Sequence, residues 1–425
     1  MIMVLLGSFM GLLLVGVPVA IALGGSSLLF VWLDETAPLL VVLHRMVSGV
    51  DSFPLLAIPF FIMAGSLMNS AGITERIYDF ALALVGWLKG GLGHVNVVGS
   101  VIFAGMSGTA VADAGGLGNI EIKAMRDHGY DVDVAVGITG ASSTIGPIIP
   151  PSLPMVIYGV MANTSIGQLF AAGLIPGLVM AGTMMIMVTY YAHTRGFHRD
   201  TTFQWSRLVY TSRRAFLPLM TPVLLIGGMV SGAFTPTEAA IAATFYALVL
   251  GVFVYRTLDL RGLVKVSMET VETTALILFI VAGASIFGWL ITTTRVTDQV
   301  ADLVLSVTTQ PWLILLMVNL FLLVIGCFME TIAAITILVP VLLPLMIKIG
   351  VDPVHFGLIM VLNLMIGLLT PPVGMVLFIL ARVANISFER TTKACAPFLI
   401  PLLITLGIVT YVPEVSLWLP TLFYR

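Results

Sequence analysis

Two proline-rich interruptions of long apolar segments constrain the fold more than any other feature of this sequence. The first, GPIIPPSLPMVIYG, begins at Gly146, and the second, GLLTPPVGMVLFIL, begins at Gly367. Proline has no backbone N–H and clashes with the preceding helical turn, so each stretch must unwind a helix. In hydrocarbon, unwound backbone is tolerated only where protein covers it or where it lines a wet cavity. Two such breaks in a hydrophobic chain are typical of the central site of a secondary transporter.

The composition places this chain in a lipid bilayer. Of its 425 residues, 59% are hydrophobic and only 9% are charged, whereas soluble domains carry roughly 25% charged residues. The net charge of −2 and the lack of a basic tail give no indication of a nucleic-acid partner. Cys327 and Cys395 lie in apolar stretches, which favours packing over a disulfide or zinc site. No phosphate loop, nucleophile elbow or HExxH motif occurs, so we do not expect an enzyme.

The first half of the chain divides into spans, polar links, a hairpin and a broken helix. A transmembrane helix needs about 20 apolar residues. On that scale we predict a span at 4–33, a link at 36–49, a span at 53–71, a link at 74–90, a hairpin at 94–127, a broken helix at 132–161 and a span at 168–191. The small and polar stretch SGTAVADAGGLG interrupts the hairpin, so we expect its tip near the middle of the membrane.

The second half repeats this order. One interval of 221 residues separates four pairs of positions, namely Gly105 and Gly326, Ala112 and Ala333, Gly146 and Gly367, and Pro150–Pro151 and Pro371–Pro372. We therefore predict a first repeat at 1–192, a basic loop and linking span at 193–232, and a second repeat at 233–425. The second repeat carries a hairpin at 311–348 and a broken helix at 353–383. A single linking span at 215–231 inverts it relative to the first.

The lysines and arginines indicate the orientation. With the N-terminus in the cytoplasm, most of the 19 basic residues fall on the cytoplasmic side, as the positive-inside rule requires. We therefore expect a cytoplasmic N-terminus and a periplasmic C-terminus. The links at 36–49, 74–90, 258–266 and 297–309 are too polar or too short to span. We expect them to lie along the interface as arms between a fixed frame and a mobile core.

Few ionisable residues fall at membrane depth. Asp113 lies at the tip of the first hairpin, and Glu330, followed by Thr331, occupies the equivalent tip of the second. A carboxylate is costly to bury in a bilayer, which makes both candidates for function. The alternatives are that Asp113 only caps the second helix of its hairpin and that Glu330 pairs with a neighbouring helix. Glu238, at the start of a span, is more simply explained as a helix N-terminal residue.

The broken helices supply oxygen ligands without charge. Unwinding around Gly146 and Gly367 frees backbone carbonyls, and hard cations such as sodium are coordinated by such groups in transporters with broken helices. Hydroxyl groups nearby come from Ser142, Ser143, Thr144 and Thr370. The alternative is that the glycines and prolines only kink the helices. Inverted symmetry predicts two cation sites, one at each pairing of a hairpin tip with a break.

Arg295 is a candidate for binding an anion. It lies just past a span in ITTTRVTD and aligns with Arg76 of the first repeat. A guanidinium group can bind a carboxylate through two parallel hydrogen bonds. The alternative is an interfacial arginine whose head group reaches out of the membrane.

Four motifs together resemble the large membrane subunit of TRAP (tripartite ATP-independent periplasmic) transporters. They are FAGMSGTAVAD at 103–113, GPIIPPS at 146–152, FTPTEAA at 234–240 and LLTPPVG at 368–374. The resemblance covers essentially the whole chain. It implies an inverted-repeat elevator fold of the ion-transporter superfamily in the bacterial inner membrane. It also implies sodium-coupled uptake of an organic acid, such as a sialic acid or a C4-dicarboxylate, delivered by a periplasmic substrate-binding protein.

The same resemblance implies a small four-helix membrane subunit as an obligate partner, encoded separately from this chain. It assigns Ser107, Asp113 and Arg295 to the substrate. It assigns to sodium Gly105, Ser107, Thr144 and Gly146 at one site, and Gly326, Glu330, Gly367 and Thr370 at the other. We expect two or more sodium ions and no other metal. Three alternatives stay open: a stand-alone sodium/dicarboxylate symporter, a channel, and proton coupling through Asp113 or Glu330.

Overall fold

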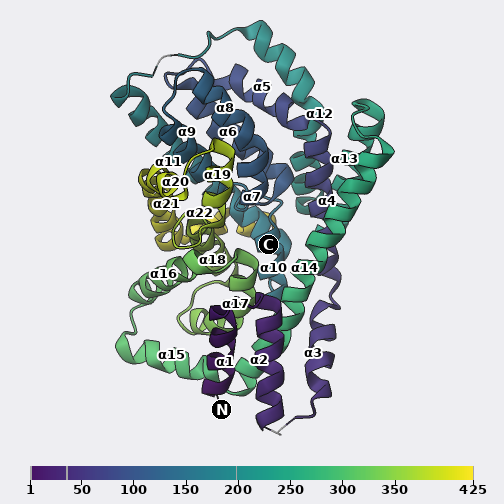
Figure 1. The fold of residues 1–425 in the computed structure, drawn as a ribbon, viewed down its shortest axis with the longest axis vertical. Coiled ribbons are helices and arrows are strands. Elements are labelled where there is room, and N and C mark those ends of the chain that lie inside the picture. The colour runs from purple at the N-terminus through teal and green to yellow at the C-terminus, as the bar shows by residue number, and fades with distance from the viewer. Residues whose placement is uncertain (1, 35–36, 198, 425) are drawn as a thin grey trace.

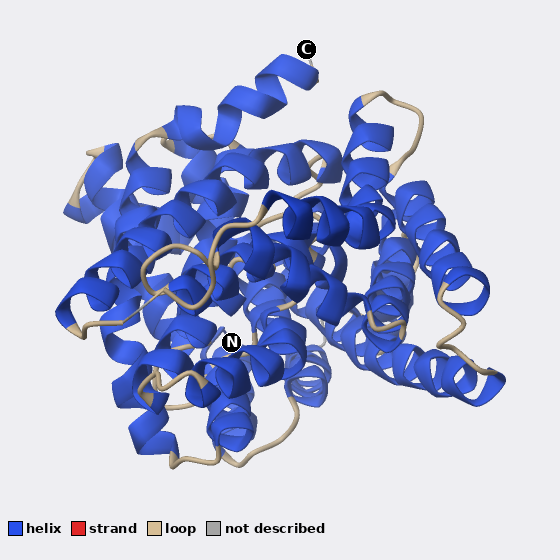
Figure 2. Ribbon diagram, turned by 90° about the horizontal axis from the view of Figure 1, so that it is seen from above, coloured by secondary structure: helices blue, strands red, loops and turns tan. Residues whose placement is uncertain are grey.

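The computed structural model describes residues 2–34, 37–197 and 199–424, without the side chains of Ile2 and Ser107. Within these residues every regular element is a helix, and eight helices are long and apolar enough to cross a membrane (Figures 1 and 2). The prediction of an all-α polytopic membrane protein is therefore confirmed.

The chain begins with two short helices where we predicted one span at 4–33. A tight turn separates α1 (Ile2–Leu14) from α2 (Val19–Asp34), with Gly16 at φ +86° and Pro18 just before α2. Glycine adopts this left-handed conformation without steric cost, and proline is well tolerated at the start of a helix. The turn is short and the helices pack together, so they run antiparallel. The prediction of a single first span is wrong.

This helix pair also bears on the predicted side of the N-terminus. α1 begins at the end of the molecule opposite α5 (Ile73–Val85) and α8 (Gly118–Asp127), the helix that carries Lys123 and Arg126 (Figure 1). Basic residues collect on the cytoplasmic side of membrane proteins. α1 begins at the other end from these basic residues; the side of the membrane on which the N-terminus lies, predicted with one first span, stays a prediction.

The remaining elements of the first half follow the predicted order. They are α3 (Leu40–Val50), η1 (Phe53–Leu56), α4 (Ala57–Ser70), α5, the hairpin of α6 (Gly91–Ser107), α7 (Ala110–Ala112), the π-helical η2 (Asp113–Leu117) and α8, the broken helix of α9 (Val132–Ser143) and α10 (Leu153–Met161), and α11 (Ile166–Thr194). The links predicted at 36–49 and 74–90 correspond to α3 and α5. The hairpin and the broken helix are both present as predicted.

The second half shows the same succession with two differences. Its elements are α12 (Trp205–Val230), α13 (Pro236–Val249) with the π-helical η3 (Leu250–Val254), α14 (Leu260–Thr293), α15 (Val296–Val307), the hairpin of α16 (Pro311–Phe328) and α17 (Thr331–Lys348), the broken helix of α18 (Pro353–Gly367) and α19 (Met375–Ala384), α20 (Phe388–Cys395), η4 (Ala396–Phe398), α21 (Leu399–Tyr411) and α22 (Pro413–Phe423). The separate link predicted at 258–266 is instead the first part of the 34-residue α14. The terminal helix α22 was not predicted.

The two broken helices lie at the centre of the molecule. Every residue of α18 from Val354 to Gly367 is buried, as are the residues of α9 from Val134 to Ser143. Around them, α4 packs on α13, and α14 packs on α2, α3 and α4, which together we call the frame. The hairpin α6–α8 enters from the α5 end and the hairpin α16–α17 from the α15 end, so their tips approach from opposite sides (Figure 1).

Candidate substrate and ion site

Both hairpin tips and both breaks line one cavity of about 510 Å³. The first tip contributes Thr109 to Val111, and the second contributes Glu330 to Ala333. The breaks contribute Pro147 and Pro154 in the first half and Leu368 and Met375 in the second. Helix α14 and the start of α2 close the cavity from the frame. The sequence pattern predicted this meeting of tips and breaks.

A smaller cavity of about 160 Å³ adjoins the first and is more polar in its side chains. The two cavities share Thr109 and Thr273, and the smaller one adds Ser66 and Asn69 from α4. Asn69 accepts a hydrogen bond from Thr74 at 3.0 Å, which fixes its amide. Hydroxyl and amide groups at one side of an otherwise apolar space can orient a polar ligand.

At the first tip the backbone contacts the first break directly. Gly108 ends α6 with φ +62°, and a Cβ there would lie 2.6 Å from the carbonyl oxygen of Pro151. Thr109 then caps the next helical turn, since its hydroxyl accepts a hydrogen bond from the N–H of Ala112 at 3.2 Å. Only glycine permits this combination of left-handed backbone and close approach. The tip and the break therefore meet main chain to main chain.

At the second tip the approach is closer still. A Cβ on Gly367 would lie 2.5 Å from the Cα of Gly326, so the hairpin and the break touch through two glycines. The N–H of Val373 donates to the carbonyl of Cys327 at 3.1 Å, and the hydroxyl of Thr370 lies 3.0 Å from the thiol of Cys327. Gly326, Gly367 and Thr370, predicted as one sodium site, are thus brought together.

Glu330 both caps a helix and lines the cavity. Its Oε2 accepts hydrogen bonds from the N–H groups of Ile332 at 2.9 Å and Ala333 at 3.1 Å, at the start of α17. The neighbouring hydroxyl of Thr331 is buried and has no hydrogen-bond partner among the described residues. An unpartnered buried oxygen facing a cavity is a group that a ligand or ion could satisfy.

Of the predicted site residues with described side chains, Glu330 alone lines the cavity, and three of the others face elsewhere. Gly105 faces α12, where a Cβ would meet Pro222 at 2.8 Å. Asp113 is buried at 1% exposure, but it faces Ser100 and lies near Glu121 inside the first hairpin. Arg295 is exposed, with φ +54° in the turn before α15. Ser107 ends α6 beside the tip, and its side chain lies outside the described residues.

Two of the hydroxyl groups before the first break bond within their own helix. Ser143 donates to the carbonyl of Gly140 at 2.8 Å, and Thr144 donates to that of Ala141 at 2.6 Å. Each oxygen keeps lone pairs while its proton is used in this way. Thr144 and Gly146 therefore stay candidates for one cation site, in contact with the first tip through Thr109.

A set of buried amides was not predicted from the sequence. Asn96, Asn319 and Asn363 are 0%, 6% and 0% exposed, and each bonds a neighbouring helix. The available signal was an asparagine in an apolar run, in HVNVV, MVNLF and VLNLM. Glu121, at 2% exposure, was missed for a different reason. It lies in the polar segment IEIKAMRD, which suggests a solvent-exposed helix.

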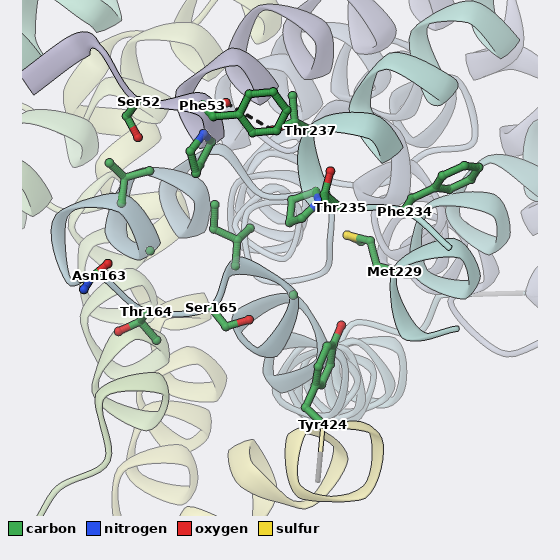
Figure 3. Close-up of a pocket in the computed structure, with 16 residues that line it drawn as sticks. Ser52, Phe53, Asn163, Thr164, Ser165, Met229, Phe234, Thr235, Thr237 and Tyr424 are labelled. Carbon is green, nitrogen blue, oxygen red and sulfur yellow. Dashed lines mark hydrogen bonds between the residues drawn. The ribbon is translucent and has the colours of Figure 1, made fainter. Parts of the chain in front are cut away.

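A further cavity of about 390 Å³ lies apart from this site, between η1, the turn from α10 to α11 and the turn from α12 to α13. Figure 3 shows Thr237 beside Phe53, whose carbonyl accepts its hydrogen bond at 3.3 Å, and Tyr424 on the opposite side. None of the predicted substrate or sodium residues lines it. We therefore assign the candidate site to the cavity at the hairpin tips.

A polytopic helical fold in which two re-entrant hairpins and two broken helices enclose a cavity is that of a membrane transporter. Residues 6–415 match the family described as "Tripartite ATP-independent periplasmic transporter, DctM component". The chain belongs to this family, and the resemblance to the large TRAP subunit is confirmed.

Named relatives cover nearly the whole chain. It is 48% identical over 415 residues to the sialic acid TRAP transporter large permease protein SiaM of Vibrio cholerae, covering 98% of this chain and 97% of that protein. It is 43% identical to the sialic acid TRAP transporter permease protein SiaT of Haemophilus influenzae, over 97% of this chain and 67% of that protein. It is 38% identical to the C4-dicarboxylate TRAP transporter large permease protein DctM of Vibrio cholerae, over 97% and 96%.

A solved structure supports the fold alone. The YdaH transporter of Alcanivorax borkumensis superposes with a TM-score of 0.61 over 88% of each chain, at 15% sequence identity. The relatives are transporter permeases rather than enzymes, in agreement with the absence of enzymatic motifs.

Proposed function

We propose that this protein is the large permease subunit of a sodium-coupled TRAP transporter that imports a carboxylate across the bacterial inner membrane. The observation that carries the proposal is the cavity lined by both hairpin tips and both breaks, in a chain of the DctM family. A periplasmic binding protein delivers the acid, and a small four-helix membrane subunit completes the permease. The C-terminus faces the periplasm.

The proposed substrate is a sialic acid. A relative with 48% identity carries that name, and a sugar acid uses more of a cavity of about 510 Å³ than a C4-dicarboxylate does. Hydroxyls of Thr109, Thr273 and Ser66 and the amide of Asn69 suit a polyhydroxylated ligand. Ser107 and the backbone N–H groups after the first tip are the proposed contacts for its carboxylate.

The proposed sodium sites lie where a tip meets a break. One uses oxygens of Gly105, Ser107, Thr144 and Gly146, and the other uses those of Gly326, Glu330, Gly367 and Thr370. Freed carbonyls, a carboxylate and hydroxyls are the ligands that a hard cation prefers. Hairpins and broken helices move together against the frame in the proposed elevator mechanism, so both sites travel with the substrate.

Reconstitution with the small subunit and a binding protein tests this proposal. Labelled sialic acid should accumulate in proteoliposomes under an inward sodium gradient at fixed pH, and labelled succinate should not. Accumulation without any binding protein would instead favour a stand-alone symporter. Accumulation driven by a pH gradient with no sodium would favour proton coupling. An ion current without substrate would favour a channel.

A further inference from the structure

In the first half, a buried asparagine joins the hairpin to the broken helix. The amide nitrogen of Asn96 on α6 donates to the hydroxyl of Thr139 on α9 at 2.7 Å. The hydroxyl of Ser142, also on α9, donates to the amide oxygen of Asn96 at 2.5 Å. All three residues are at most 1% exposed. The amide of Asn96 is thus held at both ends by one broken helix.

The second half has a related arrangement. The amide nitrogen of Asn363 on α18 donates to the amide oxygen of Asn319 on α16 at 2.8 Å. Asn319 in turn donates to the hydroxyl of Thr410 on α21 at 3.0 Å. Ser142 and Asn363 are equivalent in the 221-residue repeat, and Asn96 and Asn319 lie within two residues of equivalence. Each half therefore has an asparagine on the first helix of its hairpin that bonds the position before its break.

The bonded positions are close in sequence to the proposed ion ligands. Ser142 precedes Gly146 by about one helical turn, and Asn363 precedes Gly367 by the same spacing. A side-chain hydrogen bond in a buried, low-dielectric environment has a fixed geometry and is costly to leave unmade. Each asparagine therefore fixes its hairpin against its broken helix at a point about three helical turns before the tip.

We propose that Asn96 and Asn319 are positioning residues for sodium. Each holds its hairpin against its broken helix, so that the carbonyls at the tip and the break stay at ion-binding distance. The inference rests on the proposed sodium coupling. We expect Asn96 and Asn319 to determine the affinity for sodium and not the affinity for substrate, because neither lines the substrate cavity.

The test measures sodium dependence of uptake in proteoliposomes for Asn96→Ala, Ser142→Ala and the double variant. We expect each single change to raise the half-saturating sodium concentration by about 3-fold to 10-fold, as the coupling between contacting residues allows. The double variant should shift it no further, because both changes remove the same hydrogen bond. The substrate KM at saturating sodium should stay within about twofold of the wild type.

Ser27→Ala in the frame helix α2 is the matched control, since that buried hydroxyl donates to the carbonyl of Leu23 in its own helix and belongs to none of the proposed sites. It should leave the sodium titration unchanged. In the second half, Asn319→Ala should raise the half-saturating sodium concentration, and Thr410→Ala should lower thermal stability with a smaller effect on sodium. Ser142→Ala, the mildest truncation, keeps the test informative if Asn96→Ala folds poorly.

The proposal is overturned if Asn96→Ala and Ser142→Ala lower thermal stability but leave the sodium titration unshifted. It is also overturned if their shifts add in the double variant, or if substrate KM rises as much as the sodium requirement. A wild-type protein that ignores sodium would remove the proposed coupling itself. That failure is distinguishable, because it is seen before any variant is made.

Discussion

At the scale of single residues, Gly326 and Gly367 allow the second hairpin to touch the second break. A side chain on Gly367 would overlap the backbone of Gly326, and a Cβ on Gly326 would lie 3.1 Å from the Cα of Gly367, where backbone gives no flexible atom that could move away. The contact therefore depends on the absence of a methyl group. A site built this way tolerates very little change in spacing.

We expect Gly367→Ala to abolish sodium-dependent uptake and to cost about 1–3 kcal/mol or more of stability, because the hairpin must separate from the break. Thermal unfolding in detergent and uptake in proteoliposomes measure the two effects. Gly407→Ala in α21 is the control, since a Cβ there meets no atom within 4 Å. Normal uptake by Gly367→Ala would show that the glycine contact is not needed for transport.

Arg295 holds a conformation that suits glycine better than arginine. Its φ of +54° begins α15, and Gly72, with φ +65°, has the same role before α5. The sequence alignment had predicted that Arg295 corresponds to Arg76. In the structure Arg295 corresponds instead to Gly72. Arg76 instead packs over the ring of Tyr255 at 3.6 Å.

We predict that Arg295→Gly raises stability by about 1 kcal/mol, because a left-handed residue with a Cβ costs that much. We also expect uptake to continue, since Arg295 is exposed outside the cavity. Melting temperature and uptake rate check both parts, with Arg295→Ala as the variant that keeps the strain. Loss of uptake in both variants, with normal assembly, would restore Arg295 as a substrate residue.

At the scale of elements, the segment after α11 fastens the base of the first hairpin. The carboxylate of Asp200 accepts hydrogen bonds from the N–H of Leu92 at 2.9 Å and from the hydroxyl of Tyr130 at 2.7 Å. The ring of Tyr130 stacks on Phe197 with centroids 4.3 Å apart. One carboxylate thereby links the start of α6, the turn before α9 and the segment after α11.

We expect Tyr130→Phe to lower stability by about 1.5–3 kcal/mol, the range for a hydrogen bond to a charged group. Burial, followed by the hydrogen bond to Asp200, raises the pKa of Tyr130. The contribution of Tyr130 to the free energy of unfolding is therefore fully present below the pKa of an unfolded tyrosine, about 10, and is lost as the pH rises above that value. Thermal unfolding at neutral and alkaline pH measures this, with exposed Tyr210→Phe as control. Equal melting temperatures of Tyr130→Phe and Tyr210→Phe would contradict the prediction.

The hairpins and broken helices could be predicted because their signals are local. The paired prolines after Gly146 and Gly367 interrupt their helices, whereas single prolines such as Pro176 and Pro340 lie inside α11 and α17. The 221-residue repeat of the proline pairs supports the register. The turn at Gly16 was missed because α1 and α2 together look like one apolar span. The role of Asn96 could not be predicted, because its partners Thr139 and Ser142 are more than 40 residues away and only tertiary packing brings them close.

At the scale of the whole molecule, α14 of the frame contacts α17 of the second hairpin. The proposed elevator mechanism requires these two helices to move past each other. A Cβ on Gly288 would lie 3.6 Å from the Cβ of Pro340 across this contact. That spacing matches the Cβ separation of a disulfide, about 3.5–4.5 Å. The two positions can therefore report whether the contact must slide.

We predict that Gly288→Cys with Pro340→Cys, in a background with Cys327→Ala and Cys395→Ala, loses uptake on oxidation and regains it on reduction. The control pair is Gly251→Cys with Ala71→Cys, whose Cβ atoms are also 3.6 Å apart, at the ends of α13–η3 and α4 of the frame; the reduced pair controls for the movement of the Leu258 side chain that a Cβ on Gly251 requires. Uptake should survive that cross-link. Transport by the oxidised 288–340 pair would exclude movement between α14 and α17.

Helix α14 has no break, whereas α3, η1 and α4 divide the corresponding part of the first half. Its 34 residues extend about 51 Å, and a bilayer's hydrocarbon core is about 30 Å thick. It must tilt or continue among the lipid head groups, where Lys265 and Glu269 lie 3.9 Å apart near its start. This helix packs on α2, α3, α4 and α17, so in the proposed elevator mechanism its tilt would bear on how the second hairpin moves. We therefore expect acyl-chain length to change the transport rate.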